Sequence, residues 1–195
     1  MQDAVLFYSV YSAEKSTIIK GMGLEGMDFA LCTIHRPENT DDPVRLASIV
    51  GALNEISRRM SVVLPLHPRT RKIIASCSVP FAFEPIYPVG YFDMIELIKH
   101  TKVVLTDSGG LQKEAFFFDK PCVTLRDETE WVELLSSRAN RLAGADRELI
   151  VKYSNESITD PIVFNKDLYG NGRASENIVK YIQRDYSNIF IATVK

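Results

Sequence analysis

The segment VVLTDSGGLQKEA, residues 103–115, joins a short apolar run to a helical pattern through an aspartate, a serine and two glycines. The apolar run lacks polar alternation, which is typical of a strand covered on both faces of a sheet. The glycines allow a tight turn, and Ser108 can cap the helix that follows. When such strand–turn–helix units repeat, they build a parallel sheet flanked by helices.

Similar apolar runs recur along the chain and alternate with amphipathic stretches. We expect strands at residues 29–34, 61–66, 102–106 and 121–125, and weaker ones at 81–84 and 141–143. Helices are expected at residues 43–59, 92–99, 111–117, 147–153 and 174–186. The alternation predicts an α/β fold, a three-layer αβα Rossmann-like domain with a parallel sheet of about six strands.

The 195 residues are expected to form a single domain, because no linker or low-complexity tract divides them. Residues 2–20 are expected to form a linker helix, residues 21–173 the sheet core and residues 174–189 a C-terminal helix. The first helix is rich in apolar residues and must pack on something. Its apolar face is expected to pack either on this domain's own sheet or on a partner surface that is missing here.

Charge and hydropathy argue against several classes of protein. The formal net charge of −2 provides no broad basic surface, so we expect no nucleic-acid partner. We expect no membrane span and no secretory signal, and hence a cytoplasmic protein, because no apolar run is long enough. Cys32, Cys77 and Cys122 form no CxxC pair and are expected to be reduced thiols, and no metal site is predicted.

Polar loops surround the expected strands, and ligands of open parallel sheets bind beyond the carboxyl ends of the strands. The loops are residues 33–39, 66–69, 84–91, 107–110, 126–133 and 169–175. Each also has a plain interpretation as a capped turn, the start of a helix or a surface ion pair, such as one between Arg36 and Glu38. At least five would share one edge of the sheet, which favours a binding site over coincidence.

The Ser-Gly-Gly turn is the strongest local signal for chemistry. Its glycines let backbone N–H groups approach an anion, and a helix N-terminus adds partial positive charge. Glu114, one turn into the helix, can accept the hydroxyls of a ribose. His35 and Arg36 can meet a diphosphate, and Arg126, just past an expected strand, can face a ligand phosphate.

These loops, in this order, resemble the non-hydrolysing UDP-N-acetylglucosamine 2-epimerases. The matching pieces are Asp3-Ala4, His35-Arg36-x-Glu38-Asn39, His67-Pro68, Pro88-x-Gly90-Tyr91, Asp107-Ser108-Gly109-Gly110-x-Gln112-x-Glu114-Ala115, Lys120-Pro121, Arg126-x-x-Thr129-Glu130 and Tyr169-Gly170-x-Gly172-x-Ala174. Members of that family have two Rossmann-like domains in the GT-B arrangement. The resemblance covers only the second, so it implies that the N-terminal domain is absent here and that the full-length protein is a homodimer.

The resemblance also implies roles for individual residues. UDP would be held by Ser108, Gly109, Gly110, Glu114, Arg126, Tyr91 and Met94. The diphosphate would lie at the Ser-Gly-Gly turn and the ribose at Glu114. Tyr91 and Met94 would frame the uracil, and His35 would be a catalytic residue beside the diphosphate. Arg36, Glu38 and His67 match positions that bind a second, activating UDP-sugar in some bacterial members.

The implied reaction interconverts UDP-GlcNAc and UDP-ManNAc. A base removes the C2 proton, UDP leaves by elimination, and UDP adds back to the opposite face of the glycal. Neither a redox cofactor nor a metal is implied. The family's acid/base carboxylates lie mostly in the absent half, so the chain alone is expected to bind UDP and to be inactive.

Three departures from the family pattern leave the sugar open. Trp131-Val132 stands where Arg-Pro is commoner, Lys113 stands where an acid is usual, and residues 136–140 lack the usual glycine-bearing turn. Two other functions also stay open. One is half of a GT-B glycosyltransferase, although Thr106 stands where its Glu-x7-Glu pattern requires an acid. The other is a non-catalytic nucleotide-sugar binding module.

Overall fold

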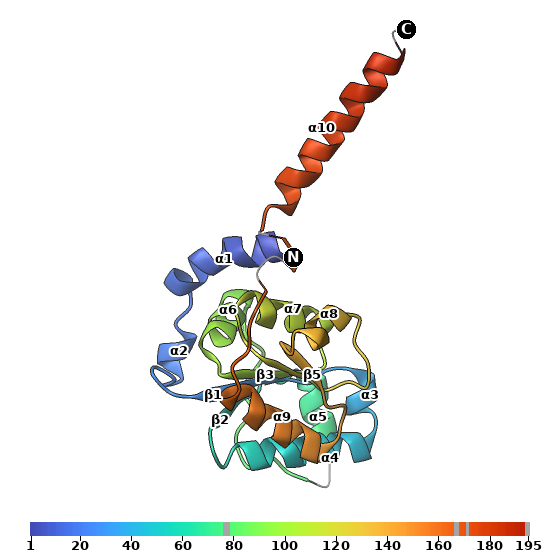
Figure 1. Ribbon diagram of the computed structural model, residues 1–195. Helices are drawn as coiled ribbons and strands as arrows, with labels where there is room; N and C mark the ends of the chain where they lie inside the picture. The colour runs from blue at the N-terminus through green and yellow to red at the C-terminus, as the bar shows by residue number, and fades with distance from the viewer. Residues whose placement is uncertain (76–78, 166–167, 171, 194–195) are drawn as a thin grey trace.

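The computed structural model describes residues 1–75, 79–165, 168–170 and 172–193, and in them five parallel strands form one sheet (Figure 1). The strands are β1 (Phe29–Thr33), β2 (Ser61–Val63), β3 (Val103–Thr106), β4 (Cys122–Thr124) and β5 (Asn140–Leu142). Their order across the sheet is β2-β1-β3-β4-β5. The strands β1 and β3 are therefore neighbours, although 69 residues (34–102) lie between the end of β1 and the start of β3.

Ten helices lie in the described residues, and several of them cover the two faces of the sheet. They are α1 (Gln2–Lys15), α2 (Ile18–Gly21), α3 (Pro37–Thr40), α4 (Pro43–Ile56), α5 (Pro68–Ala75), α6 (Tyr91–His100), α7 (Gly109–Phe117), α8 (Val132–Ser136), α9 (Arg147–Thr159) and α10 (Ala174–Thr193). In Figure 1, α6, α7 and α8 lie on one side of the sheet, and α4, α5 and α9 lie on the other. The predicted three-layer α/β fold is confirmed.

The strands supply residues alternately to two apolar cores. Ala30, Val103 and Leu105 belong to the core under α4 and α9. Leu31 and Val104 belong to the core under α6 and α7. Successive side chains of a strand point to opposite faces, so strands of this kind must be apolar throughout to bury both faces. The unbroken apolar runs in the sequence follow from this requirement.

The prediction of a sixth strand at residues 81–84 was wrong. The chain instead pairs beside β2 a little later, in a single parallel bridge between Pro65 and Ile86. Proline donates no ladder hydrogen bond, and Pro65, Pro85 and Pro88 interrupt both partners of this pairing. The aromatic rings of residues 81 and 83 pack beside the core under α4 and α9.

The N-terminal segment forms two helices, not one, because the chain becomes extended at Ser16. The helix α1 packs on α6 and α7, which themselves cover the sheet. Ser12 is fully buried there and donates to the Glu96 carboxylate at 2.5 Å. The opposite face of α1 exposes Phe7 and Val10, which are 57% and 69% accessible.

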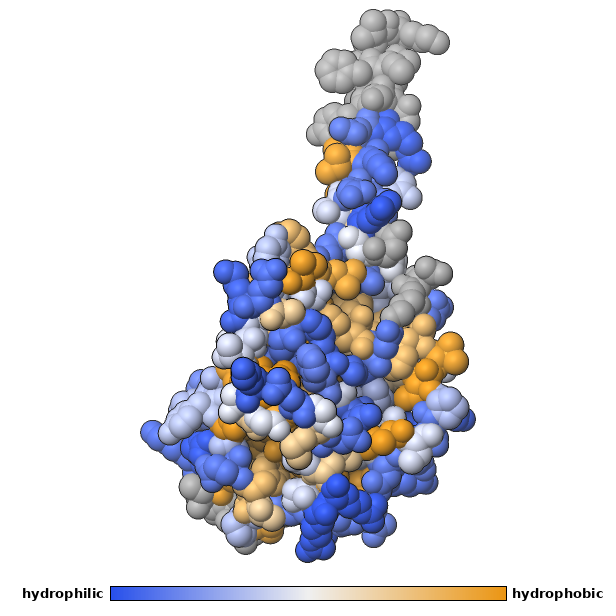
Figure 2. Space-filling view, turned by 90° about the vertical axis from the view of Figure 1, so that its left-hand side faces the viewer, coloured by the Kyte–Doolittle hydropathy of each residue, from blue (hydrophilic) through white to orange (hydrophobic). Residues whose placement is uncertain are grey.

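The helix α10 projects away from the body of the molecule (Figures 1 and 2). Its exposed apolar residues include Ile178, Val179, Tyr181 and Ile182. Among the described helices, none is both long enough and apolar enough to cross a bilayer. Cys32 and Cys122 are buried free thiols, as expected, and Cys77 lies outside the described residues.

Replacing Leu105 with alanine tests the central position of β3. Leu105 is fully buried, so Leu105→Ala should lower the free energy of unfolding by about 2–5 kcal/mol, measured by urea denaturation. Val44 is 76% exposed, and Val44→Ala should change that free energy by no more than about 0.5 kcal/mol. Equal losses of unfolding free energy in the two variants would contradict the placement of Leu105 in the core.

Candidate functional site

Two loops that are distant in sequence meet where β1 and β3 end side by side. Thr33 pairs with Thr106 in the parallel register, and their hydroxyl oxygens lie 2.6 Å apart. His35, which follows β1, and Asp107, which follows β3, are therefore brought together. The sequence-based expectation that the loops after these two strands share one edge of the sheet is confirmed.

The Asp107 carboxylate is the group that joins the two loops. It is fully buried and accepts backbone N–H groups from His35 and Arg36, each at 3.0 Å. The side-chain amide of Asn39 donates to it at 3.3 Å and to the Leu125 carbonyl at 2.8 Å. Sequence reasoning quoted Asp107 within its motif but gave it no role. The available signal was an acid placed directly after a buried strand.

The same carboxylate orients the imidazole of His35. The His35 Nδ1 atom lies 3.0 Å from Asp107 Oδ1, so Nδ1 carries a proton, because an ionised carboxylate only accepts. The hydrogen bond to Asp107 raises the pKa of His35. Burial opposes ionisation of Asp107, but hydrogen bonds from His35 and the two backbone amides outweigh it and lower the pKa of Asp107. The Nε2 atom of His35 is left to face a ligand.

The helix α7 begins at this junction with a capped and open N-terminus. The Ser108 hydroxyl accepts from the Leu111 amide at 3.4 Å, and the Ser108 amide donates to Thr106 at 2.9 Å. Within the described part of the chain, the amides of Gly109 and Gly110 donate to no other group. Free amides at a helix N-terminus attract anions, and the helix dipole adds to the attraction.

The two glycines of the turn have different surroundings. A Cβ atom on Gly109 would lie only 2.6 Å from a Glu130 carboxylate oxygen, so a side chain there would require the Glu130 side chain to move. A Cβ atom on Gly110 would meet nothing closer than 3.9 Å. Gly110 therefore leaves open space beside its amide, where a ligand can approach the backbone.

One cleft gathers most of the predicted site residues, and we name it the UDP cleft after the ligand that the sequence analysis expects there. Its volume is about 360 Å³, and it is lined by Thr33, His35, Tyr91, Met94, Ser108, Gly110, Leu111 and Glu114. Burial raises the pKa of Glu114, and the Tyr91 hydroxyl, which donates to that carboxylate at 3.5 Å, partly opposes the rise. Side chains from three separate segments of the chain thus face one space beside the open end of α7.

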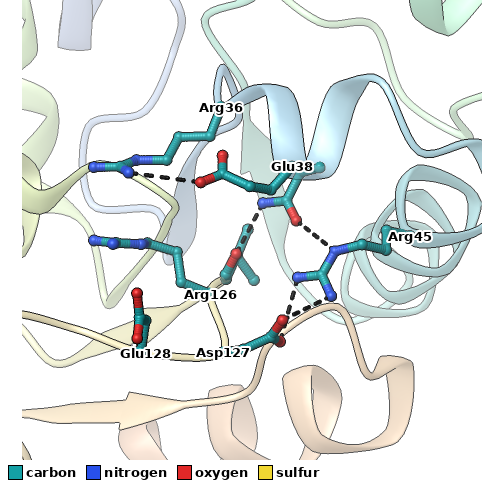
Figure 3. Close-up of a pocket in the computed structure, with 8 residues that line it drawn as sticks. Arg36, Glu38, Arg45, Arg126, Asp127 and Glu128 are labelled. Carbon is teal, nitrogen blue, oxygen red and sulfur yellow. Dashed lines mark hydrogen bonds and ion pairs between the residues drawn. The ribbon is translucent and has the colours of Figure 1, made fainter.

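A second cleft of about 250 Å³ lies next to the first along the same edge. It is lined by Arg36, Glu38, Asn39, Arg45, Leu125, Arg126, Asp127 and Glu128. Figure 3 shows the guanidinium groups of Arg36 and Arg126 extending in the same direction, one beside the other. Arg36 lies 3.9 Å from the Glu38 carboxylate, and Arg126 is paired with Glu130 at 2.6 Å.

Two predicted ligand loops do not reach either cleft. His67 is among the lining residues of neither, and its Nδ1 accepts the Arg69 amide at 3.3 Å as α5 begins. The loop that contains Tyr169 packs instead against Phe116 and Phe117 on α7. Among the described residues, no three His, Cys, Asp or Glu side chains gather as metal ligands would.

The parallel sheet, the open helix N-terminus and the edge cleft together define an α/β domain of the Rossmann-like kind that binds ligands at the carboxyl ends of its strands. A sequence model described as UDP-N-acetylglucosamine 2-epimerase matches residues 1–183. The chain belongs to this family, and the resemblance inferred from its motifs is confirmed.

Individual relatives agree with this assignment. The chain is 52% identical over 186 residues to a UDP-2,3-diacetamido-2,3-dideoxy-D-glucuronate 2-epimerase of Pseudomonas aeruginosa, covering 94% of this chain and 51% of that protein. It is 37% identical over 175 residues to a UDP-N-acetylglucosamine 2-epimerase homolog of Methanococcus maripaludis, covering 85% and 47% of the two chains. The chain therefore spans about half the length of the curated relatives it matches.

A solved structure shares the fold. The Methanocaldococcus jannaschii UDP-GlcNAc 2-epimerase, crystallised in complex with UDP-GlcNAc and UDP, superposes with a TM-score of 0.78 at 32% identity. The superposition covers 94% of this chain and 52% of that one. The predicted fold, half of a GT-B arrangement, is supported by this match. The five-stranded sheet is one strand short of the number expected.

Replacing Asp107 with asparagine tests the link between the two loops. The carboxylate raises the pKa of His35 from its ordinary value of 6.5, so Asp107→Asn should lower it. NMR titration of the ring protons measures this pKa in the variant and in the unaltered chain. His35 stabilises the folded chain fully below pH 6.5, and that contribution is lost as the pH rises through the raised pKa. An unchanged His35 titration in the variant would refute the pairing.

Proposed function

We propose that this chain is the UDP-binding half of a UDP-sugar 2-epimerase that interconverts UDP-GlcNAc and UDP-ManNAc. The observation that carries the proposal is the open N-terminus of α7 facing the same cleft as the Asp107-oriented imidazole of His35. An anion-binding helix end and a proton-bearing ring on one edge suit a diphosphate leaving group. Family membership supplies the reaction class.

In the proposed reaction, a base removes the C2 proton of the sugar and the bond to the UDP oxygen breaks. Negative charge then develops on the diphosphate. Donors that already point at this position stabilise that charge without reorganising. The amides of Gly109 and Gly110 and the Ser108 turn supply such donors. The raised pKa of His35 favours a protonated ring. Its Nε2–H can donate a hydrogen bond to a diphosphate oxygen as UDP departs and can do so again when UDP re-adds.

The remainder of the nucleotide would lie along the UDP cleft. Glu114 is on the same helix as the Ser-Gly-Gly turn, about one turn further on, and its carboxyl group can pair with the ribose hydroxyls. Tyr91 and Met94, from the start of α6, would frame the uracil. Arg126 would reach the phosphates only by giving up part of its pairing with Glu130.

The second cleft is the proposed place for an activating UDP-sugar. Arg36 and Glu38 line it, which agrees with the role that the family resemblance implies for them. His67 does not line it, so we restrict this proposal to the first two residues. The cleft holds guanidinium groups that match a second diphosphate.

We propose that the complete enzyme contains an N-terminal domain and forms a homodimer in the cytoplasm. The relatives are about twice as long as the matched part, and the apolar faces of α1 and α10 have no cover in the described residues. The base that removes the C2 proton would come from that domain. The chain described here would then be one UDP-binding domain, with residues 2–20 as its linker and residues 174–189 as its last helix.

The sugar itself has a second candidate. The 52% identical relative acts, by its name, on a UDP-sugar with acetamido groups at C2 and C3 and a carboxylate. Trp131 and Lys113, which depart from the motif of UDP-GlcNAc 2-epimerases, lie close to the diphosphate turn. Both sugars carry the C2 acetamido group beside the reacting carbon, so the same leaving-group chemistry serves either one.

The two alternative functions make different use of this cleft. A retaining glycosyltransferase requires an acid at position 106, but Thr106 is buried and its hydroxyl is bonded to Thr33 and to the Ser108 amide. That position cannot supply the missing carboxylate, which weighs against sugar transfer. A non-catalytic binding module would need only the UDP cleft. An activity assay distinguishes that function from the epimerase.

Replacing Gly110 with alanine tests the nucleotide site. The added methyl group meets no protein atom closer than 3.9 Å but fills the space beside the amide. Gly110→Ala should therefore weaken UDP binding by about tenfold or more in calorimetric titration. Thermal stability should hold or rise slightly, because alanine favours a helix over glycine.

The matched control is Gly21→Ala, whose new methyl group meets nothing within 4 Å and lies in α2, away from the UDP cleft. It should leave UDP affinity unchanged. If Gly110→Ala bound UDP as tightly as the unaltered chain, the diphosphate would not rest on this turn.

Activity is tested by NMR in D2O with UDP-GlcNAc and UDP-2,3-diacetamido-2,3-dideoxy-D-glucuronate as separate substrates. The 195-residue chain should bind UDP but exchange no C2 proton for deuterium, because the proposed base lies elsewhere. The protein with both domains should exchange deuterium and invert C2 of one of the two sugars. Deuterium exchange at C2 by the isolated chain would contradict the proposal that the base lies in another domain. Sugar transfer to an acceptor, or binding without any turnover by the longer protein, would instead favour the alternatives.

A further inference from the structure

Trp131 contacts the Ser-Gly-Gly turn from outside the UDP cleft. Its indole Nε1–H donates to the Gly109 carbonyl at 2.9 Å, and it is not among the residues that line the cleft. The ring packs in a separate apolar cluster that includes Phe116 and Leu134. The proposed function gives this tryptophan no contact with UDP.

The hydrogen bond nevertheless acts on a group that would hold UDP. The Gly109 carbonyl and the Gly110 N–H belong to one peptide unit, which is planar and trans. The two groups therefore point in opposite directions, and fixing one fixes the other. When the indole holds the carbonyl on its side, the Gly110 N–H is directed toward the other side, where Gly110 lines the UDP cleft.

The indole is itself held from the same helix. Lys113 lies four residues after Gly109, one turn along α7, so both can reach one side chain. The Lys113 Nζ atom lies 4.1 Å from the centroid of the Trp131 ring and 4.1 Å from that of Tyr169. An ammonium group over two aromatic faces is attracted to both. Tyr169 in turn donates its hydroxyl to Glu133.

The segment that carries Trp131 is also tied to the first turn of α7. The Thr129 hydroxyl donates to the buried side-chain oxygen of Gln112 at 2.7 Å and accepts from the Trp131 amide at 3.2 Å. The Glu130 carboxylate lies beside Gly109, 2.6 Å from the position that a Cβ atom would take. Three consecutive residues, 129–131, thus contact the turn on the side away from the cleft. Trp131 and Lys113, which belong to two of the three departures from the family pattern, contact each other.

We propose that Trp131 is a positioning residue for the diphosphate, which acts by fixing the Gly109–Gly110 peptide, with Lys113 as its support. The inference rests on the proposed function, because it assumes that UDP binds at this turn. It predicts a selective defect. Loss of the indole donor should weaken contacts to the diphosphate and spare contacts to the ribose and uracil, which are made by other residues.

Trp131→Phe is the informative variant, because phenylalanine keeps an aromatic face for Lys113 and removes the N–H donor, although it also fills less of the apolar cluster than the indole does. UDP affinity should fall about five- to tenfold by calorimetry, as expected for one lost hydrogen bond to a pre-organised group. Uridine, which lacks the diphosphate, should bind the variant and the unaltered chain equally in a ligand-observed NMR titration. The amide shift of Gly110 should also move in the variant without any ligand.

Tyr169→Phe is the matched control. It removes the hydroxyl bonded to Glu133 and leaves the ring over Lys113, so UDP affinity should not change. Lys113→Met should give a smaller loss of UDP affinity than Trp131→Phe. Unchanged UDP affinity in Trp131→Phe, or equal weakening of UDP and uridine, would overturn the positioning role. An unaltered chain that binds uridine but not UDP would overturn the proposed function as well, whatever the variant does.

Discussion

The site depends on one buried carboxylate, that of Asp107. An ionised acid inside a protein is stable only if donors replace the water it has lost. Here the donors are the amides of His35 and Arg36, the side-chain amide of Asn39 and the His35 ring. All come from the loop after β1, whereas Asp107 follows β3. Satisfying the carboxylate therefore forces two loops into a single arrangement.

That arrangement determines what the edge of the sheet can bind. Asp107 precedes Ser108, so the group that fixes the imidazole also fixes the start of α7. The position of the His35 ring relative to the N-terminus of α7 is thus set by covalent geometry and by the contact between the ring and the Asp107 carboxylate. The raised pKa of His35 and the open amides both favour negative charge in the same cleft. The diphosphate of the proposed UDP ligand would benefit from both.

Much of this could be predicted from the sequence, because parallel strands place their carboxyl ends together. The unbroken apolar runs predicted the sheet, and the polar residues after them predicted the UDP cleft. The failures have physical causes. Residues 81–84 are apolar enough for a strand, but nearby prolines leave only one bridge. Asp107 and Trp131 had no assigned role because their partners, His35 and Gly109, are identified only by tertiary contact.

The paired glycines show how two constraints can share one motif. The Glu130 carboxylate lies where a Gly109 side chain would begin, whereas Gly110 lies beside an open cleft. A sequence comparison treats both as parts of a phosphate loop, yet only at Gly110 would a Cβ atom point into open space. The protein side of the turn must be rigid for the ligand side to be pre-organised. Residues 129–131 and Lys113 supply that rigidity, so the specificity of the anion site extends to side chains that never reach the anion.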